Sequence, residues 1–315
     1  MTEQLHARVA WLYYLENFTQ AEIGEHLGLT RARVNRMLAE ARETGLVRVT
    51  LNSHFANCTA IEQKLKSKFG VRDAVIVPTP EDAKDIASIV GMAAGTYLTR
   101  FLAENRLSTI GIGWGATLRE TIRHVSTAVY PDLWITSMMG GLSRGLELNT
   151  FEIAGELARR LGAQCSYLAA PIYAATPRSR DTILAQEVYQ DVLARIAKID
   201  LGILSMGDLS PRSLLVRHGL PSDVSPDDLR RRGAVGDVLG QFIDAKGRAI
   251  NHAINKRAIA LPLGRLSKAK FVMLVAGGMN KAPVIAAALR GRIGNILVSD
   301  EKAASEALEL VERES

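Results

Sequence analysis

The chain has 315 residues, of which 47% are hydrophobic and 23% are charged. An apolar fraction of this size can fill a core, which excludes a mainly disordered protein, and the length suggests one large domain and a small one. Two cysteines, Cys58 and Cys165, cannot build a disulfide framework, so we expect reduced thiols. We recognise neither a signal sequence nor an apolar run of about 18–20 residues, and we therefore expect a cytoplasmic protein without membrane contact.

The formal net charge is +6, and it is unevenly distributed. Residues 1–50 contain six arginines, no lysine and six glutamates, so this segment is neutral and the whole excess lies downstream. Any prediction of DNA binding by this segment must rest on where its arginines stand, because the total charge carries little information.

Two short helices are predicted at the start of the chain. Apolar residues recur on one face of a helix over 4–16. Thr19 and Glu22 form a capping-box pattern, in which each side chain satisfies a backbone N–H at the start of a new helix. Gly28 follows the last periodic residue and ends this second helix.

A third helix follows, with Thr30 as its N-cap and Gly45 just beyond its end. Its inner stripe consists of Val34, Leu38 and Ala41. An alternating stretch at 46–51 predicts a short strand that could form a wing.

These helices match a helix-turn-helix head, winged-helix-like in its order of elements. With the apolar stripe facing inward, Arg and Asn side chains at the start of the third helix face outward, where Arg can bind guanine and Asn can bind adenine. Polar residues at helix N-termini suit phosphates. The predicted DNA-binding residues are Gln20, Thr30, Arg31, Arg33, Asn35 and Arg36.

Downstream of about residue 59, strand and helix patterns alternate. The predicted strands cover 73–77, 108–113, 133–138, 165–169, 200–206, 270–276 and 295–298. The predicted helices cover 59–69, 82–104, 116–126, 149–162, 180–197, 281–290 and a last helix capped by Asp300. A hairpin turn is predicted at 244–247. The pattern predicts an α/β fold with a largely parallel sheet, and we divide the chain into a helix-turn-helix DNA-binding domain at 1–53 and an α/β domain at 54–315.

Four predicted strand ends carry glycine-containing loops, at 111–117, 139–141, 205–208 and 276–281. Ligands of a parallel sheet bind beyond the carboxyl ends of its strands, and glycines allow backbone N–H groups to approach an anion. Thr117 can add a hydroxyl and Lys281 a full positive charge. A phosphate, or a small molecule that carries one, is the predicted ligand.

Two alternatives remain for these loops. Gly111, Gly113 and Ala116 fit a loose dinucleotide fingerprint, although the next strand ends without the expected carboxylate. The loops could also be ordinary strand-to-helix turns. Asp237, in the glycine-flanked stretch 233–240, either accepts hydrogen bonds from ligand hydroxyls or caps a turn.

An enzymatic function is the main alternative to a DNA-binding protein that responds to a phosphorylated ligand. A sugar-phosphate isomerase or deaminase would need a general base with a partner, and Asp237 is the one candidate. The six histidines show no metal-ligand spacing, and we expect no metal and no cofactor. A structural adaptor is a further alternative, but Arg33, Arg36 and Lys281 argue against it.

The sequence resembles the SorC family of sugar-binding bacterial transcriptional regulators over almost its whole length. The matching stretches are 19–24, 27–30, Gly111-Ile112-Gly113-Trp114-Gly115-Ala116-Thr117-Leu118, Gly140-Gly141, 233–237, 242–244 and 276–281.

This resemblance implies a DNA-binding head and an effector domain with the fold of sugar-phosphate isomerases, usually without catalysis. It implies a phosphorylated sugar or polyol as effector, double-stranded operator DNA as partner, and a dimer or tetramer. Carried onto this chain, it places the effector at Gly113, Gly115, Thr117, Gly141, Asp237 and Lys281. Arg144, Glu147 and Asn149 are candidates for choosing the sugar.

Overall fold

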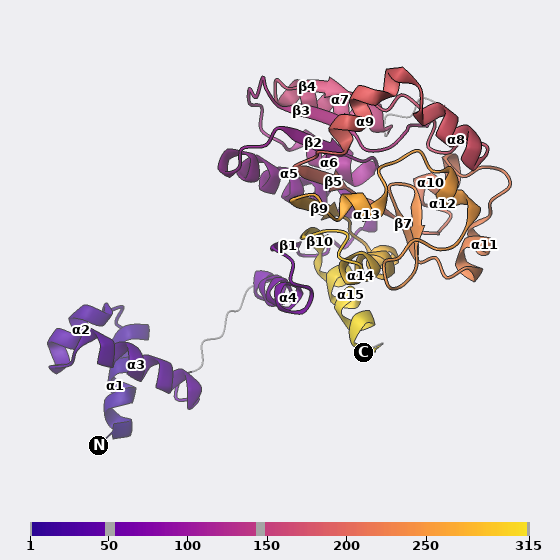
Figure 1. Ribbon diagram of the computed structural model, residues 1–315. Helices are drawn as coiled ribbons and strands as arrows, with labels where there is room; N and C mark the ends of the chain where they lie inside the picture. The colour runs from indigo at the N-terminus through magenta and orange to yellow at the C-terminus, as the bar shows by residue number, and fades with distance from the viewer. Residues whose placement is uncertain (1, 48–53, 143–148, 314–315) are drawn as a thin grey trace. The chain divides into compact units, whose positions relative to one another are not determined.

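The computed structural model describes residues 2–47, 54–142 and 149–313 (Figure 1). Contacts within the chain divide it into two compact units, Met1–Ser53 and His54–Ser315. Each unit has its own cluster of buried apolar side chains.

The small unit contains three helices, α1 (Thr2–Tyr14), α2 (Gln20–Leu27) and α3 (Arg31–Glu43). The predicted capping box is confirmed, because the Thr19 N–H donates to Glu22 Oε2 at 2.7 Å and the Glu22 N–H donates to Thr19 Oγ1 at 3.3 Å. Gly28 ends α2 with a φ of 67°, a left-handed conformation that glycine adopts without steric cost. The turn between α2 and α3 is therefore specified locally.

The inward stripe of α3 packs as predicted. The core of the unit consists of Val9, Ile23, Val34, Met37 and Leu38, all at most 5% exposed. The Arg33 N–H donates to Thr30 Oγ1 at 3.3 Å, which fits the predicted cap. Of the predicted strand at 46–51, residues 46–47 form a bend and 48–51 lie outside the described residues.

A seven-stranded parallel sheet forms the centre of the large unit, and Figure 1 shows the strands in their spatial order, β1-β10-β9-β5-β2-β3-β4. The strands are β1 (Asp73–Val77), β2 (Thr109–Ile112), β3 (Trp134–Ser137), β4 (Gln164–Ser166), β5 (Leu201–Leu204), β9 (Phe271–Val275) and β10 (Ile296–Asp300). Every residue of β2, β5, β9 and β10 is buried, as expected of parallel strands covered on both faces.

Helices surround this sheet. They are α4 (His54–Phe69), α5 (Ile86–Glu104), α6 (Ala116–Arg123), α7 (Thr150–Arg160), α8 (Pro177–Leu184), α9 (Gln190–Ile196), α10 (Leu214–His218), α11 (Pro226–Arg231), α12 (Ala253–Arg257), α13 (Leu263–Leu266), α14 (Ala282–Arg290) and α15 (Glu301–Arg313). Short 3-10 turns occur at η1 (Ala83–Asp85), η2 (Glu187–Tyr189) and η3 (Met279–Lys281).

The single helix predicted at 180–197 is wrong, because this stretch folds as α8, η2 and α9. Thr176 and Ser179 form a capping box that starts α8 earlier, with Pro177 in its first turn. The chain then leaves the helix at Gln186, which is extended (ψ 140°). The Tyr189 hydroxyl donates to the carbonyl of Ala169 at 2.9 Å, a contact between distant segments that periodicity could not reveal.

A small antiparallel sheet contains β6 (Met206–Gly207), β7 (Gly236–Val238) and β8 (Gln241–Ile243). Its hairpin turns at Leu239 and Gly240, with φ values of 53° and 72°. The sequence did not predict this hairpin, because leucine is a rare residue at a positive φ and Gly240 alone marks the turn. The hairpin turn predicted at 244–247 is confirmed, because the Gly247 N–H donates to the carbonyl of Asp244 at 2.8 Å and the antiparallel bridge Ile243↔Ala249 pairs the chain on either side of it.

Among the described residues, one helical stretch, 83–104, is long and apolar enough to cross a membrane by composition. In the structure, α5 packs against α6, β1, β9 and β10. A methyl group added at Gly91 or Gly95 would lie 2.5 Å from atoms of α6, so these glycines let the two helices approach closely. The apolar character of α5 is therefore explained by its burial in the core of the large unit.

Candidate functional site

A cavity of about 180 Å³ lies beyond the carboxyl ends of β2, β5 and β9. After β2 the chain proceeds outward to β3 and β4, whereas after β5 it returns through β9 and β10 towards β1. The adjacent strands β2 and β5 therefore form a topological switch point, where open α/β sheets bind their ligands. The lining residues are Trp114, Gly115, Ala116, Thr117, Ser205, Met206, Gly207, Asp208, Arg212, Ser213, Leu214, Leu215, Asp237, Asn280 and Lys281.

The N-terminus of α6 forms one wall of this cavity. Gly115 is its N-cap residue, with a φ of 121°, and no side chain caps the helix. A Cβ at Gly115 would lie 2.8 Å from Ser205 Oγ, whose hydroxyl donates to the carbonyl of Trp114 at 2.7 Å. Backbone conformation and space both favour glycine, and the uncapped helix start offers N–H groups and a positive dipole to an anion.

Asp237 enters the cavity from the small sheet. Its cross-strand partner is Gly207, where an added methyl group would collide with the Asp237 carboxylate. The Gly240 N–H donates to Asp237 Oδ2 at 3.0 Å, so the carboxylate supports the hairpin turn while it also lines the cavity. The turn role predicted as one alternative for Asp237 is therefore confirmed, and the residue also stands in the cavity lining, as the ligand-binding alternative requires.

Two charged groups in the cavity have displaced pKa values. Burial raises the pKa of Asp237 to about 6, against the lowering effects of the Gly240 N–H and Lys281, and with a further rise due to Asp208. Burial lowers the pKa of Lys281, whereas the carboxylates of Asp208 and Asp237 act in the opposite direction. No carboxylate of the described residues lies within ion-pair distance of Lys281. Lys281 therefore retains capacity for an anionic ligand.

Sequence reasoning missed several lining residues. Asp208 is 6% exposed, accepts the Ser210 N–H at 2.7 Å, and accepts the Asn280 side-chain amide at 2.7 Å. Arg212, an exposed side chain, adds a second cation. Gly207 marks the loop at 205–208 in the sequence, but the local sequence does not indicate that 208–215 folds back over the strand ends.

The structure brings together Gly115, Thr117, Asp237 and Lys281, but two predicted residues lie outside the lining. The Gly113 N–H donates to the carbonyl of Ile203 at 2.8 Å, and the Gly141 N–H donates to the carbonyl of Ala170 at 2.8 Å. Both amides are therefore occupied within the fold.

The loop candidates for choosing the sugar are only partly described. Arg144 and Glu147 lie outside the described residues. Asn149 is 7% exposed, and its side-chain amide pairs with the backbone of Leu142 in both directions. It holds the loop start and does not line the cavity.

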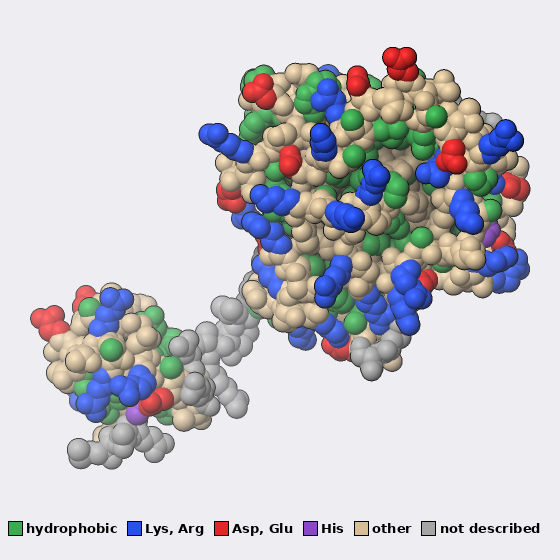
Figure 2. All heavy atoms as spheres, viewed as in Figure 1, with side chains coloured by type: hydrophobic (Ala, Val, Ile, Leu, Met, Phe, Trp, Pro, Cys, Tyr) green, Lys and Arg blue, Asp and Glu red, His purple; other side chains and the backbone are tan. Residues whose placement is uncertain are grey.

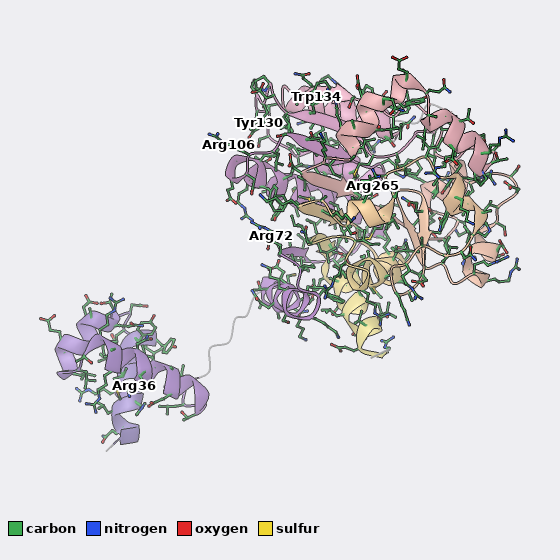
Figure 3. The ribbon with its side chains drawn as sticks, viewed as in Figure 1. Arg36, Arg72, Arg106, Tyr130, Trp134 and Arg265 are labelled. Carbon is green, nitrogen blue, oxygen red and sulfur yellow. The ribbon has the colours of Figure 1, made fainter. Side chains whose placement is uncertain are left out.

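A second candidate surface lies on α3 of the small unit. Arg31, Arg33, Asn35 and Arg36 are all exposed, and none forms an ion pair with a described residue. Arg36 is labelled in Figure 3. The buried stripe on the opposite side of α3 fixes this orientation.

The start of α2 adjoins this surface. Gln20 Nε2 donates to Asn35 Oδ1 at 3.5 Å, which links the start of α2 to α3. Gln20 and Arg31 also line one open cleft with Thr19 and Ala21. Backbone N–H groups at a helix start and an arginine on one cleft form a suitable surface for DNA phosphates.

Both units match models of known protein families. Residues 53–309 match the family model described as "Putative sugar-binding domain", and residues 5–44 match "Sigma-70, region 4". The chain is 32% identical over 310 residues to the transcriptional regulator LsrR of Escherichia coli K12, covering 96% of this chain and 94% of LsrR. It is 27% identical over 303 residues to the erythritol catabolism regulatory protein EryD of Brucella abortus, covering 96% and 95%.

The fold agrees with solved structures of regulators. The full-length sorbitol operon regulator SorC from Klebsiella pneumoniae superimposes with a TM-score of 0.75 at 25% identity, covering 97% of this chain and 98% of SorC. These relatives are transcriptional regulators and not enzymes, which confirms the preference for a regulator over an isomerase or deaminase. The chain belongs to the SorC family of sugar-binding, DNA-binding transcriptional regulators.

Proposed function

We propose that a phosphorylated sugar or polyol binds the cavity at the β2–β5 switch point and controls the DNA affinity of the small unit. In this scheme, residues 1–53 read operator DNA, and residues 54–315 bind the effector and form the oligomer. DNA binding places the protein in the bacterial cytoplasm.

The observation that carries the phosphate assignment is the convergence of positive groups on one small cavity. The uncapped N-terminus of α6, Lys281 and Arg212 all line it. An anion held by backbone N–H groups and an ammonium forms charge-assisted hydrogen bonds, which are about twice as strong as neutral ones. Gly115 and Thr117 would lie against the phosphate.

The same cavity also carries hydrogen-bonding groups suited to hydroxyls. Asp208, Asp237 and Asn280 line it together, and the two carboxylates are at most 6% exposed. A purely anionic ligand would be repelled by them, whereas sugar or polyol hydroxyls can donate to carboxylate oxygens. A ligand with a phosphate at one end and hydroxyls along its length satisfies both halves of the cavity.

On the DNA side, Arg33, Asn35 and Arg36 would contact base edges in the major groove. Gln20, Thr30 and Arg31 would contact phosphates. One three-helix head has a small reading surface, so we propose that a dimer or tetramer binds a two-fold symmetric operator, with half-sites spaced by a helical turn or a multiple of it.

A thermal-shift screen tests the effector assignment. Sugar and polyol phosphates are compared with their unphosphorylated forms on wild type, and a true effector at about 100 Kd stabilises the native state by ~2.7 kcal/mol. Equal shifts from a phosphorylated ligand and its unphosphorylated form would contradict the assignment.

DNA reading is tested on a duplex selected by the full-length protein from a random pool. Arg33→Ala or Arg36→Ala should weaken binding by about 1–3 kcal/mol if the side chain contacts a base, with effector affinity unchanged. Equal losses on selected and mixed-sequence duplexes would show a phosphate contact, and no loss would contradict the proposed role of that residue.

A further inference from the structure

The amino-terminal edge of the large sheet, opposite the effector cavity, carries a row of exposed cations. Six residues, here called the basic edge, make up this row. Five of them lie within about three residues of the start of β1, β2, β5 or β9, and the sixth, Arg265, belongs to α13, which precedes β9; the five are Arg72, Arg106, Lys198, Lys268 and Lys270. Figure 3 labels three of them, Arg72, Arg106 and Arg265. Figure 2, in the same view, shows basic side chains spread over the visible face of the large unit with fewer acidic ones among them.

Hydrogen bonds between the strand starts set the order of these segments in space. The Arg72 N–H donates to the carbonyl of Asn295 at 2.7 Å, and Asn295 Nδ2 donates to the carbonyl of Lys270 at 2.9 Å. The first amide of β9 donates to the carbonyl of Asp200, and the Ser108 N–H donates to Asp200 Oδ2 at 2.7 Å. The basic edge thus crosses five neighbouring strands, which at about 4.8 Å per strand is a row of ~19 Å.

The charge of the basic edge is not neutralised within the fold. None of the six side chains forms an ion pair with a described residue. Arg72 and Lys270 lie over the ring of Phe271, at 5.0 and 5.1 Å from its centre.

Nearby carboxylates have other roles. Asp73 pairs with Lys66 at 2.8 Å, Glu104 lies 4.0 Å from Arg100, and Asp200 accepts the N–H groups of Ser108 and Thr109. Asp132, before β3, and Glu104 are exposed, and Glu104 lines one pocket with Arg72. The row therefore has a strong excess of positive charge.

We propose that the basic edge binds the phosphates of duplex DNA and supplies electrostatic affinity that the head lacks. Residues 1–50 are formally neutral, whereas the large unit carries the whole net charge of +6. Sequence-independent DNA affinity comes from the neutralisation of phosphates by Lys and Arg, and duplex DNA presents one charge per about 1.7 Å. This inference rests on the DNA-binding function and extends it to a surface outside the head.

The test compares two full-length variants of equal charge. The edge variant carries Arg106→Gln, Lys198→Gln, Arg265→Gln and Lys268→Gln, which leaves the two cations on Phe271 in place. The control variant neutralises four exposed cations elsewhere on the large unit, none in an ion pair with a described residue, through Lys84→Gln, Lys246→Gln, Lys256→Gln and Lys302→Gln.

Binding is measured by anisotropy on a mixed-sequence duplex of about 60 base pairs over a series of salt concentrations. Each phosphate contact contributes about 0.9 to the slope of log K against log salt concentration. The slope of the edge variant should therefore be smaller in magnitude by about 2–4, and its affinity near 0.1 M salt should be at least about tenfold lower than that of wild type. The control variant should lose less than one slope unit, and both variants should keep the unfolding midpoint and effector affinity of wild type.

Several results would overturn the proposal. The first is a salt slope of the edge variant equal to that of wild type. The second is an equal loss of slope and affinity in the edge and control variants, and the third is failure of wild type to bind the mixed-sequence duplex. Tighter edge-dependent binding of an RNA duplex or polyglutamate would make DNA the wrong partner, and a changed oligomeric state with an unchanged slope would make the edge an interface between copies. Specific recognition by the head is measured separately on the selected duplex, so failure of one function is distinguishable from failure of the other.

Discussion

Asp237→Asn should make the protein more stable and its effector binding weaker. Asp237 is 4% exposed, and burial raises its pKa from 3.8 to about 6. Because the folded protein holds this proton more tightly than the unfolded chain, the ionised carboxylate destabilises the fold. The destabilisation is complete above pH 6 and disappears as the pH falls from 6 to 3.8.

A difference of about two pKa units corresponds to ~3 kcal/mol at neutral and alkaline pH. This figure already includes the attraction between the carboxylate and the Lys281 ammonium, which lowers the pKa of Asp237. The hydrogen bond from the Gly240 N–H can be kept, since an asparagine side-chain carbonyl also accepts. We therefore expect Asp237→Asn to raise the free energy of unfolding by about 1–3 kcal/mol near pH 8 and to leave it unchanged near pH 4.

Urea unfolding at a series of pH values measures this effect. Asp244→Asn is the matched control: burial raises the pKa of Asp244, but hydrogen bonds from Arg248 and Lys246 outweigh burial and hold it below its ordinary value. The ionised Asp244 therefore stabilises the fold at a pH above its ordinary pKa, and this stabilisation is lost on acidification. Asp244→Asn should accordingly be less stable than wild type near pH 8. An Asp237→Asn protein that is less stable than wild type near pH 8, or whose gain persists near pH 4, would refute the reasoning.

The binding half of the prediction is measured by calorimetry. Asp237→Asn should lower the affinity for the phosphorylated effector found in the screen, because a neutral amide replaces a carboxylate that accepts hydrogen bonds from ligand hydroxyls. Inorganic phosphate binding should be largely unchanged. Unchanged affinity for the effector would remove Asp237 from ligand recognition and leave it as a turn residue.

Three further perturbations test separate parts of the structure. Lys281→Ala should lower the affinity for the phosphorylated effector about 10- to 150-fold, because it removes one charge-assisted hydrogen bond. Calorimetry measures this loss, and anisotropy should show that DNA binding is retained. Gly207→Ala should cost about 1–3 kcal/mol in urea unfolding through collision with the Asp237 carboxylate, and the loss should shrink in an Asp237→Ala background. Thr19→Ala should reduce hydrogen-exchange protection of α2 by about 1 kcal/mol, whereas Thr44→Ala, in an exposed residue that caps no helix start, should not.

Features that depend on residues close together in the chain could be predicted from the amino-acid sequence alone. The capping box of Thr19 and Glu22, the left-handed Gly28 and the inward stripe of α3 are decided within one or two helical turns, so the head was predictable together with its outward-facing arginines. The aliphatic strands were equally predictable, because burial on both faces leaves a continuous apolar run. Positions of Thr117 and Lys281 followed from their place at the ends of such strands.

Tertiary structure decided which of these loops share one cavity. Gly113 and Gly141 stand in glycine-rich strand ends like Gly115, but the Gly113 amide donates to Ile203 of β5 and the Gly141 amide donates to Ala170 in the loop after β4. Asp208 and Arg212 line the cavity because 208–215 folds back over the sheet edge, a placement that depends on distant segments.

The hairpin of the small sheet also depended on long-range contacts. Leu239 holds a positive φ, while the Gly240 N–H is bonded to the Asp237 carboxylate and the Gly240 carbonyl accepts the Tyr173 hydroxyl at 2.6 Å. The basic edge arises in the same way, since Arg72, Arg106 and Lys198 come from separate segments. Periodicity and capping report on neighbours in sequence, whereas strand order, which only the folded sheet fixes, determines which side chains meet.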